Sequence, residues 1–217
     1  MGRRSDPGAP APGLRERNKL QKHERIRAAA GDLFTRRGYE ATTMRQIAKR
    51  AHVGLGTLFN YADDKRDLVF LIFNDELAAL TSAALRAPRP DDPLVEQLLA
   101  IARCHYRQFG ARVELSRILL RELTFYSRGK QAGAFLTIRH RLIDGIEELV
   151  RRAQRSGRIR AKDDPKLIGR HIFFVYSAAL RWWIAAARPD PRKGVADLRR
   201  LLELQFNGLG PRPSRRH

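Results

Sequence analysis

The chain has 217 residues and a formal net charge of +20, with 43 Lys and Arg against 23 Asp and Glu. This length suits one or two domains with a substantial core, and a hydrophobic content of 43% excludes a disordered chain. The single cysteine, Cys104, excludes a disulfide framework and fits a reducing compartment, so we expect a cytoplasmic protein. We expect no secretory signal, and no membrane span, because Arg181 interrupts the richest apolar stretch, residues 171–187.

The positive charge is spread along the chain. Residues 1–86 carry 16 basic and 10 acidic side chains, and residues 87–217 carry 27 and 13. Such a balance favours a nucleic acid, an anionic membrane or an anionic ligand as partner. The basic residues are 35 Arg and only 8 Lys, so part of the charge reflects a compositional bias. Charge alone therefore does not choose among these partners.

The spacing of apolar residues follows a helical period along almost the whole chain. Residues 1–13 are rich in proline and glycine and are expected to form a flexible arm. Apolar positions between residues 26 and 34 then mark one face of a first helix, and Gly38 suits a left-handed position at its end. Because no strand or hairpin signal follows, we predict an all-α protein of about nine helices.

Two short helices with a tight connection are the most informative part of the sequence. Thr43 and Gln46 have the spacing of a capping box, which starts a second helix that ends near Arg50. Residues 51–54 form a turn into a third helix that ends near Tyr61. This arrangement is typical of a helix-turn-helix, whose second helix enters the DNA major groove.

Side-chain size in this motif supports the same interpretation. Ala48 lies where the two helices cross, and a larger side chain there would separate them. The outer face of the third helix carries Gly56, Thr57 and Asn60, which are small or polar, and Leu55, which suits contact with a thymine methyl group. Such a face lets the backbone approach the base edges, and the polar side chains offer hydrogen-bonding groups to bases or phosphates.

The later helices are delimited by capping signals. Asp63 or Asp64 is expected to cap a long fourth helix that begins with Lys65, a candidate phosphate anchor. Two further helices share the start signal Asp-Asp-Pro, at residues 91–93 and 163–165, in which a capping carboxylate precedes a proline. The remaining helices are expected at about 92–109, 113–127, 130–156, 164–188 and 193–207.

The segment GYEATTMRQIA at residues 38–48, followed by VGLGTLFNY at residues 53–61 and by Lys65, resembles the DNA-binding domain of the TetR family of bacterial repressors. The resemblance covers about residues 20–70. It implies a homodimeric, ligand-responsive transcription factor, usually a repressor, that binds a palindromic operator in double-stranded DNA.

The resemblance also implies a division into a helix-turn-helix domain at residues 14–64 and a helical effector-binding and dimerisation domain at residues 65–217. The residues expected to contact DNA are Thr43, Arg45, Gly54, Leu55, Gly56, Thr57, Phe59, Asn60, Tyr61 and Lys65. His52 departs from the family, which usually has glycine in this turn; if the position is left-handed, histidine is among the residues that tolerate it at a modest penalty. Phe59 replaces a frequent tyrosine and therefore lacks a hydroxyl for a phosphate.

In similar proteins the later helices enclose a ligand cavity, which predicts a small-molecule effector here. The candidates to line it are Phe73, Arg103, His105, Phe109, Arg121, Phe125, Tyr126, Phe174 and Tyr176. Plain core packing is the alternative for each. The effector is either a hydrophobic or aromatic compound or an anionic molecule such as a fatty acyl-CoA. We predict no cofactor and no metal site.

Similar proteins dimerise through their last two helices. The corresponding candidates in this chain are Leu180, Trp183, Ile184, Leu198, Leu201, Leu202 and Phe206. A dimer agrees with DNA binding because two half-sites require two recognition helices about one DNA turn apart. Leucines at helical spacing also fit an internal core, so that alternative stays open.

Two other classes of function remain. A basic architectural protein that binds DNA without sequence preference and without an effector would explain the charge. An α-helical enzyme or carrier could keep the motif as a relic, but the sequence has neither a glycine-rich phosphate loop nor a nucleophile elbow. A further set of basic residues either contacts DNA or forms a solvated tail: Arg3, Arg4, Arg15, Arg17 and Lys19.

Overall fold

The computed structural model of the chain describes residues 13–159 and 163–207. Within these residues the regular structure consists of nine α-helices and no strand, as predicted. The helices are α1 (Leu14–Arg37), α2 (Met44–Arg50), α3 (Leu55–Phe59), α4 (Lys65–Arg86), α5 (Leu94–Ala111), α6 (Val113–Glu122), α7 (Ala132–Arg155), α8 (Pro165–Ala185) and α9 (Pro191–Asn207). Apart from Gly13, the predicted arm lies outside the described residues, as do Arg3 and Arg4.

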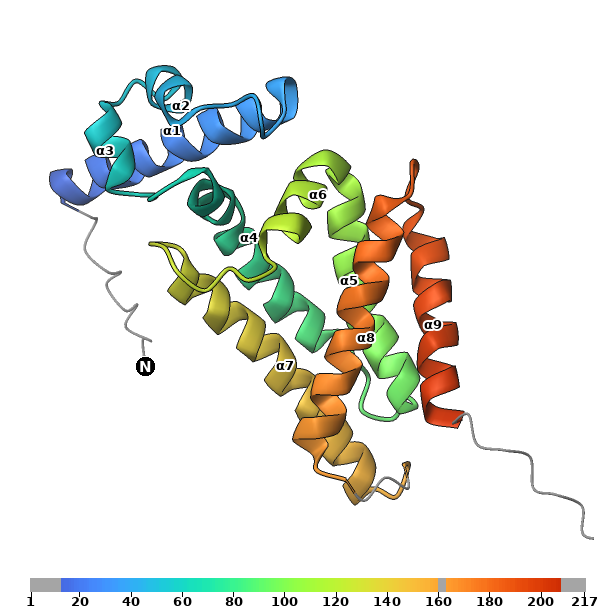
Figure 1. Cartoon of the computed structure of the whole chain (residues 1–217). Coiled ribbons are helices and arrows are strands. Elements are labelled where there is room, and N and C mark those ends of the chain that lie inside the picture. Colours follow the sequence, from blue (N-terminus) through green and yellow to red (C-terminus); the bar gives the residue numbers. More distant parts are fainter. Residues whose placement is uncertain (1–12, 160–162, 208–217) are drawn as a thin grey trace, which may run out of the picture.

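Two groups of helices are joined by one long helix. Figure 1 shows α1, α2 and α3 gathered at one end of the molecule and α5 to α9 packed as a bundle beside and below them. Helix α4 packs against α1 and also against α5, α6 and α7. Its six consecutive residues 68–73 are all buried. A helix with apolar residues all round is a core helix, so α4 is the part that holds the two groups together.

Helix α4 is more apolar than was expected of any stretch in this chain. By length and composition alone it could cross a membrane. However, 56% of its most apolar window is buried inside the fold. Burial of this kind is what the core helix of a folded domain shows.

The predicted aspartate caps form at two of three helix starts. Asp64 accepts a hydrogen bond from the backbone N–H three residues later (2.7 Å), and Asp164 accepts one from two residues later (3.0 Å). The prediction of a capping carboxylate before α5 was wrong, because this helix follows Pro93 without any side-chain cap. Instead, the Gln97 side chain, in the first turn of α5, donates to the Asp92 carbonyl at 2.7 Å. This bond holds the segment that precedes the helix.

Candidate DNA-binding interface and effector cavity

The helix-turn-helix forms by local interactions, as the sequence predicts. The Thr43 hydroxyl accepts from the Gln46 N–H at 3.2 Å, and the Gln46 side chain accepts from the Thr43 N–H at 2.9 Å. In the turn, His52 has a φ of 52°, so this position is left-handed and is occupied by one of the residues that tolerate it. The Val53 N–H then donates to the Ala48 carbonyl at 3.1 Å, which closes the turn against α2.

The outer surface of the motif is free for a partner. Ile47, Ala48 and Leu58 are 0–3% exposed and form the crossing of α2 and α3. A Cβ atom at Gly56 would meet no atom of residues 13–159 or 163–207 within 4 Å, so the described fold does not require glycine there. A missing side chain instead leaves room for close approach from outside. Of the predicted contact residues, Thr43, Arg45, Gly54, Gly56, Phe59 and Asn60 are exposed, and Leu55, Thr57, Tyr61 and Lys65 are half-buried.

Two predicted phosphate contacts already have protein partners. The Tyr61 hydroxyl donates to the Lys19 carbonyl at 3.3 Å, which ties the end of α3 to α1. A phenol has one proton to donate, so this contact uses the proton that a phosphate bond from Tyr61 would need. The Lys65 ammonium donates to the carbonyls of Tyr39 (2.8 Å) and Glu40 (3.1 Å). It has three N–H groups, so one remains for a phosphate.

Asp67, in the first turn of α4, is the buried centre of the junction between the two groups of helices. Its side chain is only 1% exposed. One carboxylate oxygen accepts from the backbone N–H groups of Asp63 and Lys130, each at 2.9 Å. The other accepts from the Gln131 N–H at 3.0 Å and from the Tyr126 hydroxyl. Four donors compensate the buried charge, so the carboxylate fixes α4 to the loop before α7.

That loop, residues 123–131, also reaches the recognition helix α3. The Gln131 side-chain amide donates to the Tyr61 carbonyl, directly after α3, at 3.0 Å. On the other side of the loop, the Arg66 guanidinium donates to the Thr124 carbonyl. One short segment is therefore bonded both to the start of α4 and to the end of α3. We name this set of contacts the α6–α7 junction.

A cavity of about 260 Å³ lies between α4, α5, α6, α7 and α8. Its lining is mostly aliphatic and aromatic. Residues 123–125, at the start of the loop between α6 and α7, form part of it. Phe125 and Phe174 are 91% and 60% exposed, which indicates that the cavity opens to solvent between them. Five of the nine predicted effector residues line this cavity, namely His105, Phe109, Phe125, Phe174 and Tyr176.

The polar groups of the cavity are cationic or neutral. His105 is buried and its Nδ1 lies 3.1 Å from the Ile101 carbonyl, while burial lowers its pKa to about 4, so the ring is neutral at pH 7. Arg181 bonds only to the Ser177 carbonyl (3.1 Å), and its buried Nε has no partner in the described structure. Burial lowers the pKa of Arg181. Arg139 also lines the cavity, and no acidic residue does.

Four predicted effector residues do not line this cavity. Phe73 belongs to the buried stretch of α4. Tyr126 turns away from the cavity to donate to Asp67. Arg103 and Arg121 form ion pairs with glutamates near the surface, at 3.2 and 3.0 Å. Helical spacing places a residue on a helix without saying which neighbour it faces, so these four stay predictions without support from this cavity.

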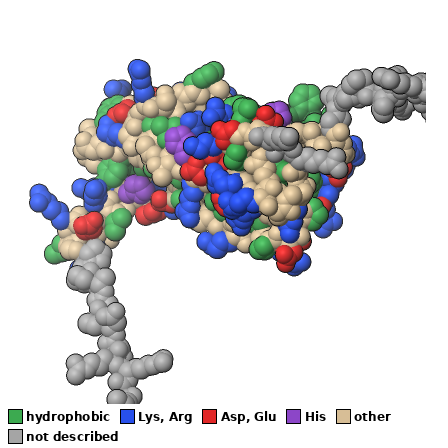
Figure 2. Space-filling model, turned by 90° about the horizontal axis from the view of Figure 1, so that it is seen from below, with side chains coloured by type: hydrophobic (Ala, Val, Ile, Leu, Met, Phe, Trp, Pro, Cys, Tyr) green, Lys and Arg blue, Asp and Glu red, His purple; other side chains and the backbone are tan. Residues whose placement is uncertain are grey.

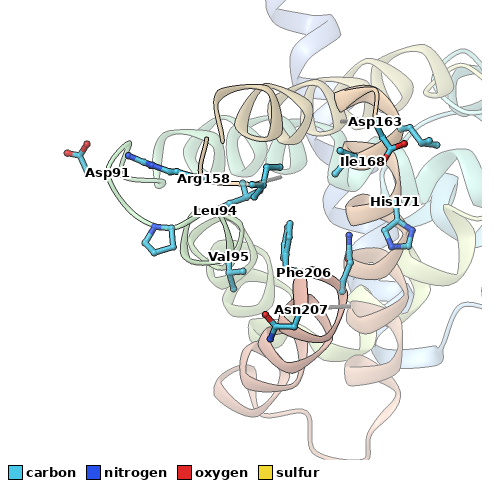
Figure 3. A pocket seen from close by; sticks show the side chains of 13 residues that line it. Asp91, Leu94, Val95, Arg158, Asp163, Ile168, His171, Phe206 and Asn207 are labelled. Carbon is cyan, nitrogen blue, oxygen red and sulfur yellow. The ribbon is translucent and has the colours of Figure 1, made fainter. Parts of the chain in front are cut away.

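A second, larger hollow lies at the end of the molecule away from α3. Figure 3 shows side chains from the start of α5, from α8 and from the end of α9 around it, and its volume is about 1050 Å³. Ile159, Asp163 and Asn207 border it, and each adjoins a segment that the structure does not describe. It therefore carries no ligand assignment. In the described part of the chain, no group of three or more His, Cys, Asp or Glu could hold a metal ion.

The predicted dimer contacts divide into buried and accessible residues. Five of them belong to the protomer's own core, namely Leu180, Trp183, Ile184, Leu198 and Leu202, each at most 7% exposed. Trp183, for example, packs on Tyr106 with 4.7 Å between ring centroids. Leu201 is 42% exposed and Phe206 is half-buried. The accessible apolar residues of these helices also include Trp182 and Leu204, which are 85% and 49% exposed.

Comparison with known sequences assigns the chain to a family. Residues 26–72 match the family described as bacterial regulatory proteins, tetR family. Residues 91–207, more than half of the chain, match the tetracyclin repressor-like, C-terminal domain. The chain belongs to the TetR family. This TetR-family protein is therefore a DNA-binding transcriptional regulator of the helix-turn-helix type, and the resemblance of residues 38–65 is confirmed.

Relatives of this TetR-family regulator extend along nearly its whole length. The HTH-type transcriptional regulator YhgD of Bacillus subtilis (strain 168) is 26% identical over 82% of this chain and 93% of its own. FadR of Thermus thermophilus, a TetR-family repressor solved with lauroyl-CoA, is 25% identical, with a TM-score of 0.66 over 90% of this chain and 98% of its own. FadR of Bacillus subtilis, solved with stearoyl-CoA, has the same fold at 20% identity and a TM-score of 0.67, over 87% of this chain and all of its own.

Proposed function

We propose that this regulator is a cytoplasmic, dimeric repressor that binds a palindromic operator and releases it when a small molecule enters the cavity. The observation that carries the proposal is the α6–α7 junction. Residues 123–125 line the cavity, while Gln131 of the same loop bonds to the Tyr61 carbonyl at 3.0 Å. A ligand that displaces this loop displaces α3. Release requires that the ligand bind the arrangement with low DNA affinity more tightly than the other.

The DNA-reading surface is the outer face of α3. Thr57 and Asn60 supply hydrogen-bonding groups for base edges, and Gly56 permits close approach of the backbone. The third N–H of Lys65 and the exposed Arg45 are directed to phosphates. Because α3 itself carries no charged residue, sequence preference depends on these short polar side chains.

The dimer interface is formed by the accessible apolar residues of α8 and α9. Its main contacts are Leu201, which was predicted, together with Trp182 and Leu204, which are exposed where five other predicted residues are buried. Three large apolar side chains exposed on neighbouring helices are typical of an association surface. Pairing of two protomers would place two copies of α3 on successive turns of one DNA face.

The effector is an amphipathic anion. A cavity of about 260 Å³ is small for a whole cofactor-sized molecule but accepts an apolar chain or ring. The half-buried Arg181 has no carboxylate within ion-pair distance among the described residues, so a bound anion would supply the missing partner. The lauroyl-CoA bound by the Thermus FadR combines an acyl chain with an anionic head, and this class of molecule fits both features.

The double substitution Thr57→Ala and Asn60→Ala is expected to lower operator affinity at least tenfold, because each base contact contributes about 1–3 kcal/mol of discrimination. The operator is first recovered by selection from random DNA with the wild-type protein. Affinities for that duplex and for a random duplex are then compared by fluorescence anisotropy. The ratio between them is expected to fall towards one.

Thr137→Ala, an exposed substitution on α7, serves as the control and is expected to leave both affinities unchanged. If the double variant keeps the wild-type ratio, α3 does not read the operator through these side chains. If the wild-type protein itself binds both duplexes equally and with the same salt dependence, the architectural alternative holds instead.

Arg181→Gln is expected to lower the affinity for laurate and lauroyl-CoA about tenfold or more, because a hydrogen bond to a charged group is worth about 1.5–3 kcal/mol. Affinity for the neutral probe dodecanol is expected to stay within about twofold. Isothermal titration with the three probes measures the difference.

Arg103→Gln is the matched control, since Arg103 lies outside the cavity and pairs with Glu96 at 3.2 Å. It is expected to leave all three affinities unchanged. A loss of laurate binding that is equal in both variants would contradict the assignment of Arg181 as the anion partner.

A further inference from the structure

The first turns of α1 extend beyond the core of the protein. Residues 14–22 are all exposed, and Ile26 is the first buried residue of the helix. The core stripe of α1 begins there and continues through Ala29, Ala30 and Leu33. A helical segment that buries nothing gains no stability from packing, so its sequence is free to serve another surface.

Basic residues continue the core stripe into this projecting part. Counting back from Ile26 by 4, 7 and 11 residues reaches Lys22, Lys19 and Arg15, which therefore share one face of the helix. At 1.5 Å per residue this stripe is about 10 Å long, the length of about three base-pair steps along a DNA strand. The helix face that packs into the core from Ile26 onward is therefore cationic over residues 15–22.

The recognition helix lies directly beside this stripe. The Tyr61 hydroxyl, just after α3, bonds to the Lys19 carbonyl at 3.3 Å, and the rings of His23 and Tyr61 lie 6.1 Å apart. Figure 1 shows the start of α1 next to α3, and in Figure 2 Lys and Arg side chains project from the surface near the start of the described chain. The stripe and α3 are thus held in a fixed relation.

The charges of the stripe are not neutralised within the described part of the protein. None of Arg15, Lys19 and Lys22 forms an ion pair there, and the nearby Glu24 pairs with Arg27 at 3.2 Å. Some basic residues elsewhere are neutralised: Arg151, Arg152 and Arg155 of α7, for instance, all pair with Glu148. Three exposed cations without acidic partners, fixed beside a DNA-reading helix, are complementary to a row of phosphates.

We propose that Arg15, Lys19 and Lys22 form a second DNA-contact surface, which binds the sugar-phosphate backbone flanking the groove that α3 occupies. The inference rests on the proposed function, since it needs α3 in the major groove. The contact carries no base recognition. It raises affinity for every duplex and makes that affinity more sensitive to salt.

The test is the triple variant R15Q/K19Q/K22Q against the control R86Q/R89Q/R141Q, which removes three exposed charges from α4, the loop after it and α7. Affinities for the selected operator and for a random duplex of equal length are measured between 50 and 200 mM salt, roughly the range over which binding to phosphates responds most clearly. The triple variant is expected to bind both duplexes at least tenfold more weakly. The slope of its log affinity against log salt is expected to be shallower by about 0.9 for each phosphate that it no longer binds.

A shorter operator duplex without flanks supplies the second measurement. On it the triple variant and the wild type are expected to bind equally, because the phosphates that the stripe contacts are absent. Equal behaviour of the triple variant and its control on the long duplex would overturn the inference and leave the segment a solvated helix end. A different result would refute the proposed function: the wild-type protein itself would bind operator and random DNA equally.

Discussion

Asp67→Asn is expected to lower the free energy of unfolding by about 3–5 kcal/mol, the largest effect on stability that we predict. The carboxylate is buried and accepts four hydrogen bonds, two at each oxygen. An asparagine of the same shape turns one of these oxygens into an NH₂ group, which faces two donors and bonds to neither. In a chain of this size the melting temperature falls by roughly 10 °C. Thermal and urea unfolding measure both quantities.

Asp75→Asn supplies the control on the same helix. Asp75 is exposed on α4, so its substitution is expected to change the free energy of unfolding by less than about 0.5 kcal/mol. Tyr126→Phe removes one of the four hydrogen bonds to Asp67. Its loss of unfolding free energy is expected to lie between those of the Asp67 and Asp75 variants. Equal stability of the Asp67 and Asp75 variants would show that the four hydrogen bonds do not stabilise the junction.

Ala48→Leu is expected to lower operator affinity about a hundredfold while effector affinity stays within about twofold. Ala48 is 3% exposed at the crossing of α2 and α3, and the added carbon atoms have no space there. Helix α3 is pushed out of register with the groove, so its side chains no longer reach the base edges. Anisotropy with the operator duplex and titration with laurate measure the two affinities.

The control is Ala134→Leu, which adds the same side chain at an exposed position of α7. It is expected to leave operator binding unchanged. Circular dichroism on both variants establishes that the helices persist. If the Ala48 variant kept full operator affinity, the crossing of α2 and α3 would not set the position of the recognition helix.

The helix-turn-helix was predictable because its determinants act over a few residues. The Thr43–Gln46 capping box spans three positions, and the left-handed His52 stands where the family usually has glycine. The small size of Ala48 is likewise explained within the motif, because α3 crosses α2 at this residue. Such local rules transfer from the sequence to the structure without knowledge of the tertiary fold.

The cavity and the dimer surface depend on contacts that the sequence does not encode locally. Tyr126 was expected in the cavity, but its hydroxyl bonds to Asp67, 59 residues earlier in the chain. Trp183 and Leu198 have the spacing of an interface helix, and the same spacing serves the protomer's own core. Asp67 itself was missed, because an acidic residue in a first helical turn is already explained by the helix dipole.

The buried carboxylate at the junction has a consequence for how the protein unfolds. Its donors come from residue 63, before α4, and from residues 126–131, between α6 and α7. Separating the start of α4 from the loop before α7 would leave a buried charge without its donors, so these two segments are expected to unfold together. The Gln131 bond to the Tyr61 carbonyl extends this coupling to the end of α3. A ligand bound in the cavity would then protect the amide hydrogens of α2 and α3 from exchange, although it touches neither helix.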